Sequence, residues 1–433
     1  MNTYQQAEQY ILSIPKFAGK HTLEDTGRWL HAMTDGACSS KIVHVAGTNG
    51  KGSVCAYLQS ILMEAGYRVG LFISPHLETM RERISINREM ISEKDFVRHF
   101  EKLKAYADRE DNKEGHPSFF EFLFLMAMSY FDEQRPDYVI LETGLGGRLD
   151  ATNCISNPKL CVITEIGFDH MQYLGNMLEQ IAGEKAGIIK PSVPLVYFDR
   201  RPQTSRVLED AARKKKAETF PVEKSQIRNV TMRKKSIDFS FGNSYYSYDG
   251  LVLRTVASYQ TENASLAIAA ANALQDDAVT GEAIKRGLLN AFWPGRMEEI
   301  LPDVYLDGAH NEDGIEAFLQ TVRKQKQGRN LLLFGVVADK QYHRMIAQLA
   351  NAGLFAHIAV TVLESDRSAS IDKLKVDWEQ YQNVNCSFHK SAEEAFCDLI
   401  SMRNATDTIY IAGSLYLVGQ IKTLVRRTSD DRL

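Results

Sequence analysis

The sequence predicts an α/β protein in which largely parallel sheets carry helices on both faces. One observation is that short apolar runs alternate with segments of helical periodicity, as where residues 41–47 lead into residues 53–66. Strands that are unbroken in hydrophobicity and separated by helices are typical of parallel sheets covered on both sides. Another is the length of 433 residues, which exceeds what one hydrophobic core usually supports. We therefore expect more than one domain.

The order of the elements places the division of the chain near Pro294. Further strands are expected at residues 68–74, 137–144 and 159–167. An alternating, β-rich stretch at residues 236–256 predicts hairpins that form a small appended sheet. After Pro294 and its neighbours, which interrupt the pattern, strands and helices alternate again. The prediction is a P-loop-type parallel-sheet domain with the small sheet over residues 1–293, and a Rossmann-like α/β domain over residues 294–433.

Composition argues against several classes of protein. The net charge of −4 argues against a nucleic-acid partner held on a broad basic face. The cysteines form no CxxC pair and are expected to be reduced thiols of a cytoplasmic protein; they are Cys38, Cys55, Cys154, Cys161, Cys386 and Cys397. No basic lead or long apolar run opens the chain, so no signal peptide is expected. The most apolar segment, residues 119–131, contains Glu121 and is too short to span a bilayer, which predicts a buried helix and no membrane contact.

The stretch VAGTNGKGSVC, from Val45 to Cys55, has the chemical parts of a phosphate-binding loop. A Gly-rich turn between a strand and a helix exposes backbone N–H groups and points the positive end of the helix at a phosphate. In the common pattern Ser or Thr follows the lysine directly, whereas here Gly52 separates Lys51 from Ser53. Lys51 would bring its charge to the β- and γ-phosphates, and Gly52 would let the backbone pass close to them. The alternative is an ordinary Gly-rich turn.

Three polar clusters of the first domain follow predicted strands, at the sheet edge where open parallel sheets bind ligands. Ser74 closes one strand and could offer a hydroxyl to a metal. Glu142 ends another strand, where an ionised carboxylate needs a partner such as a divalent cation or a lysine. His170 lies beyond a third strand, as a ligand or as a structural hydrogen-bonder. Since His is unusual for Mg²⁺, water or Mn²⁺ could share that site.

Other candidates lie on a helix and in the second domain. Lys185 is expected on a helix that stops at a glycine, as a site residue or as an ordinary ion-pair lysine. Asp307 and His310 follow a strand of the second domain and could hold ribose hydroxyls and a phosphate. Asp339 and Lys340 occupy the same kind of position.

Taken in order, the motifs of the chain resemble those of the folylpolyglutamate synthase / dihydrofolate synthase family, within the wider group of Mur ligases. The motifs, which run from about residue 40 to residue 420, are VAGTNGKGS, SPHL, LETGLGGRLDATN, FDHMQYLG, IAGEKAGIIK, PGRME, LDGAHN and GSLYLVG. LGGRLDATN and EKAGIIK together separate the chain from the cell-wall ligases. On this resemblance, the inserted Gly52 is the group's own form of the phosphate loop.

The resemblance implies an ATP- and Mg²⁺-dependent ligase. Such an enzyme phosphorylates the carboxylate of dihydropteroate or of a reduced folate, and the amine of L-glutamate then displaces phosphate to form an amide, leaving ADP and phosphate. Phosphorylation gives a poor electrophile a leaving group, so the protein mainly positions the reactants and neutralises charge. One or two Mg²⁺ ions, with K⁺ as a further candidate, and a cytoplasmic monomer are expected.

The resemblance also implies roles for individual residues. The phosphates of ATP would be held by Gly47, Thr48, Asn49, Gly50, Lys51, Gly52 and Ser53, with further ATP contacts from Asn263, Arg296, Asp307 and His310. Ser74, Glu142 and His170 match metal ligands. Lys51, His310 and a carbamylated Lys185 would take part in catalysis. The acceptor would lie against Phe119, Phe120, Leu149, Asp150 and Ala151, with residues 22–25 nearby.

Two departures and three alternatives remain open at this point. Glu312 stands where the family usually has proline, which puts a carboxylate close to a phosphate site unless the side chain turns outward. The stretch from Asp25 to Ser40 fits the family's pattern loosely. A monofunctional folylpolyglutamate synthase, a cell-wall precursor ligase and a nucleotide-binding module without ligase chemistry are the competing functions. Assays with different acceptors separate them.

Overall fold

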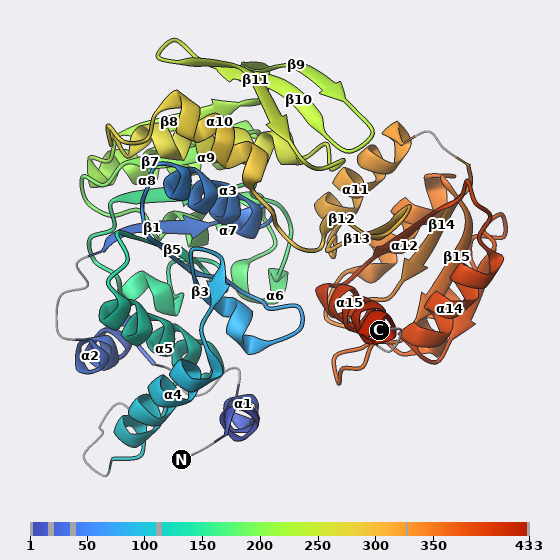
Figure 1. The fold of residues 1–433 in the computed structure, drawn as a ribbon, viewed down its shortest axis with the longest axis horizontal. Coiled ribbons are helices and arrows are strands. Elements are labelled where there is room, and N and C mark those ends of the chain that lie inside the picture. Colours follow the sequence, from blue (N-terminus) through green and yellow to red (C-terminus); the bar gives the residue numbers. More distant parts are fainter. Residues whose placement is uncertain (1–2, 16–20, 35–39, 110–114, 326–327, 431–433) are drawn as a thin grey trace.

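Three β-sheets with helices packed against them make up the computed structural model of the protein (Figure 1). The structure describes residues 3–15, 21–34, 40–109, 115–325 and 328–430, and Cys38 lies outside the described residues. The five other cysteines are all free thiols, as expected. Within the described part of the chain, no helix combines the length and apolar character that a bilayer crossing requires.

The first sheet has eight strands in the order β4-β3-β2-β5-β1-β6-β7-β8. Neighbouring strands are parallel, except that β3 is antiparallel to both β2 and β4. Its strands are β1 (Lys41–Ala46), β2 (Val69–Phe72), β3 (Ile84–Ile86), β4 (Glu89–Met90), β5 (Tyr138–Glu142), β6 (Leu160–Ile163), β7 (Leu195–Asp199) and β8 (Thr219–Glu223). Central β1 pairs with β5, where Val45 lies opposite Glu142, and with β6, where Ala46 lies opposite Ile163. Because these strands are parallel, the segments that follow them leave the sheet at one edge.

Helices cover both faces of this sheet. One face carries α3 (Lys51–Glu64), α9 (Gln260–Ala273) and α10 (Gly281–Asn290). The other face carries α1 (Tyr4–Ser13), α2 (Leu23–Met33), α4 (Glu93–Ala107), α5 (Phe119–Gln134), α7 (Leu178–Ala186) and α8 (Pro202–Lys215). As expected for the most apolar segment, α5 is buried continuously from Phe122 to Phe131. Short helical turns are α6 (Met171–Leu174), η1 (Met80–Arg83), η2 (Ala151–Cys154) and η3 (Lys224–Gln226).

The predicted small sheet is present and antiparallel. It consists of β9 (Ile227–Met232), β10 (Ile237–Gly242) and β11 (Ser247–Leu253). Phe239 and Leu251 share the core that α3 and α9 form on the first sheet. Alternation of apolar and polar residues is thus explained by one face that packs on the first domain while the other faces solvent.

The third sheet belongs to the C-terminal part of the chain, drawn in orange and red in Figure 1. Its order is β12-β13-β17-β14-β15-β16, and only β12 runs antiparallel to its neighbour. The strands are β12 (Arg296–Leu301), β13 (Val304–Asp307), β14 (Asn330–Phe334), β15 (Phe355–Thr361), β16 (Cys386–His389) and β17 (Thr408–Ala412). Its helices are α11 (Glu312–Lys324), α12 (Tyr342–Asn351) and α13 (Ile371–Trp378) on one face, with α14 (Ala392–Met402) and α15 (Leu415–Asp430) on the other.

The predicted α/β fold class is therefore confirmed. A division of the chain between residues 293 and 294 stays a prediction, and β12 begins two residues beyond it, at Arg296.

Candidate active site

The loop after β1 leaves backbone amides free at the start of α3. The first intrahelical bond runs from the Val54 N–H to the Gly50 carbonyl, at 2.9 Å. The amides of Lys51, Gly52 and Ser53 therefore have no acceptor within the helix. Since α3 is 14 residues long, its macrodipole adds partial positive charge at this end. The start of α3 is thus suited to an anion such as a phosphate.

Close packing explains the glycines of this loop. Gly50 has φ +85°, and a Cβ there would lie 2.3 Å from Asn263 Oδ1 on α9. Gly52 faces the indole of Trp293, and a Cβ would lie 2.6 Å from that ring. In this chain, a glycine is therefore required between Lys51 and Ser53 because a side chain there would collide with Trp293.

Lys51 is the cation at the centre of the site. Its Nζ donates to the carbonyl oxygens of Gly47 and Thr48, at 3.2 and 3.3 Å, and lies 3.9 Å from Glu142 Oε1. Glu142 is buried, and its Oε2 accepts the N–H of Ser74 at 3.1 Å. Burial raises the pKa of Glu142, while the charge of Lys51 opposes that shift. The structure thus joins Lys51, Glu142 and Ser74, which the sequence separates.

Glu142 has the character of a cation ligand. Its carboxylate is buried, and its nearest cation, Lys51, is beyond hydrogen-bonding distance. A carboxylate of this kind fits a divalent cation. Among the described residues, no group of three or more His, Cys, Asp or Glu side chains forms a metal cluster. Any ion at Glu142 would therefore have at most one other such side chain as a ligand, and hydroxyls, phosphates or water would supply the rest.

Lys185 lies beneath the same loop. It is buried on α7, and its Nζ donates to the Gly47 carbonyl at 2.8 Å. Burial, assisted by the nearby charge of Lys51, lowers the pKa of Lys185 to about 7. A substantial fraction of this amine is therefore neutral near neutral pH, which makes it nucleophilic.

His170 and its neighbour Asp169 face the C-terminal domain. His170 has φ +49°, and burial lowers the pKa of its ring to about 4. Asp169 Oδ1 pairs with Lys340, and its Oδ2 lies 3.6 Å from His310 Nε2 and accepts from Asn311 Nδ2 at 3.3 Å. Burial would raise the pKa of Asp169, but the interaction with His310 and the charge of Lys340 outweigh it and hold that pKa well below its usual range. The two domains are therefore joined by a buried ion pair.

A second link between the domains involves the phosphate loop itself. The amides of Asn49 and Asn311 exchange hydrogen bonds of 3.3 and 2.9 Å. Asn311 caps α11 by accepting from the Gly314 N–H. The loop therefore lies directly against the start of the C-terminal domain's first helix.

The residues of the second domain that are expected to contact ATP lie against other groups of the protein. Asp307 is buried and accepts from Tyr259 Oη, Met297 N and Ala309 N, at 2.6, 3.1 and 2.9 Å. Arg296 lies against Gly308, where a Cβ would meet its guanidinium. His310 Nδ1 donates to the Gly308 carbonyl at 2.7 Å, so its Nε2 faces the domain interface.

Glu312 turns away from the loop. It stands at the start of α11, and its carboxylate accepts from Arg344 on α12 at 3.0 Å. Of the two orientations open from sequence, the structure has the outward one.

The expected acceptor side is built on α5 and the loop after β5. Phe119, Phe120 and Ala151 belong to one apolar cluster, and residues 22–25 open α2, which contacts α5 and η2. Asp150 is buried and holds this loop by accepting from Leu145 N and the hydroxyl of Thr152. Leu149, in contrast, is 70% exposed.

Several neighbours of the site were missed from sequence. Gln260 donates to Ser53 Oγ at 3.1 Å, and the Thr164 hydroxyl donates to the Asn49 carbonyl at 2.6 Å. Of the missed residues, Asp169 could have been found most easily from the sequence, since it directly precedes His170 in a stretch already singled out. Its partner Lys340 was noted as following a strand, but nothing in the sequence shows that they meet.

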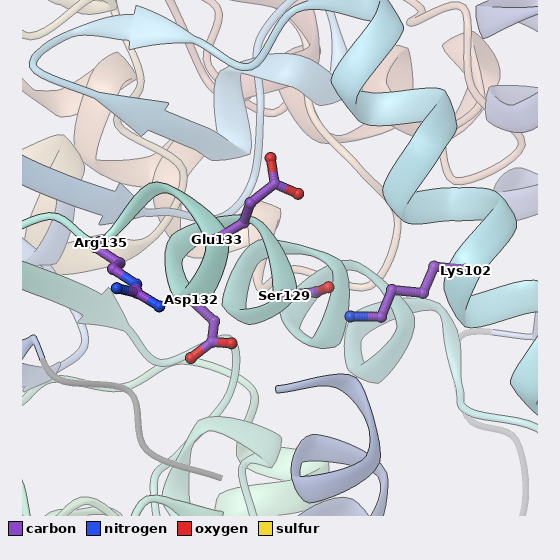
Figure 2. A pocket seen from close by; sticks show the side chains of 5 residues that line it. All are labelled: Lys102, Ser129, Asp132, Glu133 and Arg135. Atoms are coloured by element: carbon purple, nitrogen blue, oxygen red, sulfur yellow. The ribbon is translucent and has the colours of Figure 1, made fainter. Parts of the chain in front are cut away.

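A separate polar cavity of about 440 Å³ lies between α4 and α5. Figure 2 shows the side chains that line it, which are Lys102, Ser129, Asp132, Glu133 and Arg135. Lys102 donates to the Met33 carbonyl at 2.8 Å, and Glu133 accepts from Arg98 at the same distance. Because these charges have protein partners and no expected site residue lines the cavity, we assign no ligand to it.

Comparison with known proteins agrees with this geometry. The Mur ligase middle domain matches residues 45–271, and the Mur ligase glutamate ligase domain matches residues 295–415. Fold and site thus define a ligase of the Mur class. The chain is 36% identical over 431 residues to the dihydrofolate synthase/folylpolyglutamate synthase of Bacillus subtilis, covering 97% of this chain and 98% of that protein. It belongs to the dihydrofolate synthase/folylpolyglutamate synthase family.

Solved structures give the same result. E. coli FolC in complex with DHPP and ADP is similar with a TM-score of 0.87 at 28% identity, over 99% of both chains. Mycobacterium tuberculosis folylpolyglutamate synthase complexed with ADP is similar with a TM-score of 0.88 at 28% identity, over 98% of both chains.

Proposed function

We propose that this protein is an ATP-dependent ligase that adds L-glutamate both to dihydropteroate and to the glutamate of reduced folates. The observation that carries the proposal is the start of α3, where free amides and Lys51 lie between the buried Glu142 and Asn311 of the C-terminal domain. The Bacillus subtilis relative is named for both activities and aligns over nearly the whole chain.

The reaction has two steps. A carboxylate oxygen of the acceptor attacks the γ-phosphorus of ATP, which gives an acyl phosphate and ADP. The amine of glutamate, after losing a proton, attacks the acyl carbon, and the bond from that carbon to the phosphate oxygen breaks. Gly47 to Ser53 hold the phosphates, and the charge of Lys51 offsets the negative charge of the transferred group.

Glu142, Ser74 and His170 would hold Mg²⁺. Ser74 is held to Glu142 by its own N–H, and the charge of Lys51 acts on both Glu142 and His170. When bound, the ion neutralises phosphate charge during transfer. K⁺ is a further candidate cofactor.

Carbamylation of Lys185 is part of the proposal. The neutral amine adds to CO₂ and releases a proton. A lysine that is ordinarily a cation thereby becomes a carboxylate. The support is the buried position of Lys185 against the phosphate loop and its lowered pKa of about 7. The product would help to hold a second metal ion or the glutamate.

The C-terminal domain completes the nucleotide site. We assign Asn263, Arg296 and Asp307 to contacts with ATP, and His310 to the region of the β-phosphate. The contact of Asn263 with Gly50 and the position of His310 beside Asp169 support these assignments. The pterin acceptor lies against Phe119, Phe120 and the loop from Leu149 to Ala151. We propose a cytoplasmic monomer.

An assay with two different acceptors tests the proposed function. The protein is incubated with ATP, Mg²⁺ and L-glutamate, and with either dihydropteroate or tetrahydrofolate. We expect phosphate release and a product heavier by one glutamate with both acceptors. Product with tetrahydrofolate alone would reduce the function to that of a monofunctional folylpolyglutamate synthase. Phosphate release at background with both acceptors would contradict the ligase itself.

A further inference from the structure

Arg83 is a buried cation that forms no ion pair within the described part of the chain. It ends η1 and is 6% exposed, and it is the only arginine buried in the described part of the chain. Its Nε donates to His76 Nδ1 at 2.8 Å, and its guanidinium lies 5.4 Å from the centre of the Phe119 ring. Within the described residues, no carboxylate is close enough to form an ion pair with it. Two donor nitrogens, Nη1 and Nη2, therefore remain for a ligand.

A buried charge of this kind is costly unless it is compensated. Removing a guanidinium from water disfavours its charged form, and burial lowers the pKa of Arg83 to about 10. Tyr416, Glu142 and Glu82 oppose the shift only from a distance. Since even this pKa leaves the group charged at neutral pH, the site favours an anion that arrives with the substrate.

The position of Arg83 indicates which anion. Its carbonyl accepts the N–H of Ile73 at 3.1 Å, and the next residue, Ser74, donates to Glu142. Arg83 therefore lies between the aromatic wall at Phe119 and the carboxylate at Glu142. In the proposed function, these two places receive the pterin acceptor and the phosphate transfer. The carboxylate of the acceptor has to lie between them.

We propose that Arg83 binds the acceptor carboxylate that is to be phosphorylated. A planar guanidinium with two free nitrogens on one side matches a carboxylate in a two-pronged geometry. The hydrogen bond to His76 and the contact with Phe119 fix the plane of the guanidinium. Arg83 thereby directs a carboxylate oxygen toward the phosphates at the start of α3. This inference rests on the proposed function, because it requires a pterin acceptor at Phe119.

Binding of two ligands separates this role from a structural one. The probes are dihydropteroate and its uncharged primary amide, and their dissociation constants are measured with the ADP-loaded protein. For the unmodified protein we expect the carboxylate to bind about ten- to a hundredfold more tightly than the amide, as for a charge-assisted hydrogen bond. Arg83→Met should remove most of this ratio and leave amide binding nearly unchanged. Arg83→Lys, which keeps charge but loses the fork, should keep part of the ratio.

Arg88→Met is the matched control, since Arg88 lies at the other end of β3 from Arg83 but is exposed and donates to Ser60. It should keep the full ratio. If Arg83→Met does not fold, as judged by circular dichroism, Arg83→Lys alone tests the inference. We then expect its preference for the carboxylate over the amide to be severalfold smaller than that of the unmodified protein. An unchanged ratio in the folded Arg83 variants would overturn the inference, as would equal binding of both ligands by the unmodified protein. Binding of neither ligand by the unmodified protein would instead contradict the proposed acceptor.

Discussion

The phosphate loop and the domain interface around Asp169 are both polar regions of the candidate site, but they are built differently. The loop comes from consecutive residues, Gly47 to Ser53, at the junction of β1 and α3. The interface is built from three separate segments, which supply Asp169, the adjacent pair His310 and Asn311, and Lys340. The first is a local structure that any junction from a strand to a helix with these glycines could form. The second exists only when the two domains are in contact, because its residues come from both of them.

The loop should be the more sensitive of the two regions, and Lys51→Ala the most damaging change. The substitution removes the charge that, in the proposed function, offsets the transferred phosphate, while the apolar core stays intact. We expect kcat to fall by about a hundred- to a thousandfold. Steady-state phosphate release measures it, with Lys285→Ala on the exposed face of α10 as the control. A near-normal kcat for Lys51→Ala would remove the phosphate-loop assignment.

Lys185 supports the loop from below, so its loss should cost less. For Lys185→Ala we expect about a ten- to a hundredfold loss of activity, in the range found for residues that support metal ligands. Short carboxylates such as acetate should restore part of it, because they would replace the proposed carbamate. Full activity without added carboxylate would make Lys185 purely structural.

The pH dependence of carbamylation gives the same residue a second test. The reaction needs the neutral amine, so the carbamate content should rise with pH through the lowered pKa of about 7. An ordinary lysine would require a far higher pH. Carbon-13 NMR of the protein in labelled bicarbonate measures the carbamate, with Lys185→Ala as the blank. A carbamate content that does not change between about pH 6 and about pH 8 would contradict the neutral-amine argument.

Asp169→Asn tests the interface, and its effect should be smaller again. The substitution keeps the shape but leaves the mostly buried Lys340 without its counter-charge. We expect kcat/KM for ATP to fall about tenfold, equivalent to about 1.4 kcal/mol. Asp313→Asn is the control, because its pair with Arg201 crosses the same interface with both side chains about a quarter exposed. Its effect should stay within about 1 kcal/mol. Equal effects of the two substitutions would argue against a special role of Asp169.

Gly52→Ala tests the packing of the loop through the stability of the protein, not through its activity. The added methyl group would lie 2.6 Å from the Trp293 ring, so the ring or the start of α3 must move. Overpacking of this kind costs about 1–3 kcal/mol of the free energy of unfolding. Thermal unfolding measures the loss, and Trp293→Ala in the same chain should relieve part of it. No relief in the double variant would mean that the glycine is required for another reason.

Much of the fold and the loop could be predicted from the sequence because both depend on neighbouring residues. Unbroken apolar runs identified β1, β5 and β6, and the glycines beside Lys51 identified the turn between β1 and α3. The contact of Gly52 with Trp293, the pair of Asp169 with Lys340 and the isolation of Arg83 could not be predicted, because they depend on how distant segments pack. The direction of the Glu312 side chain was also open, since only the position of the helix that carries Arg344 decides it.

The most direct measurement of the proposed chemistry follows an oxygen atom. Dihydropteroate with heavy oxygen in its carboxylate is converted with ATP and L-glutamate, and the released phosphate is analysed by mass spectrometry. An acyl phosphate predicts one heavy oxygen in each phosphate, because the carboxylate oxygen that attacks phosphorus leaves with it. Amide product accompanied by unlabelled phosphate would contradict the account.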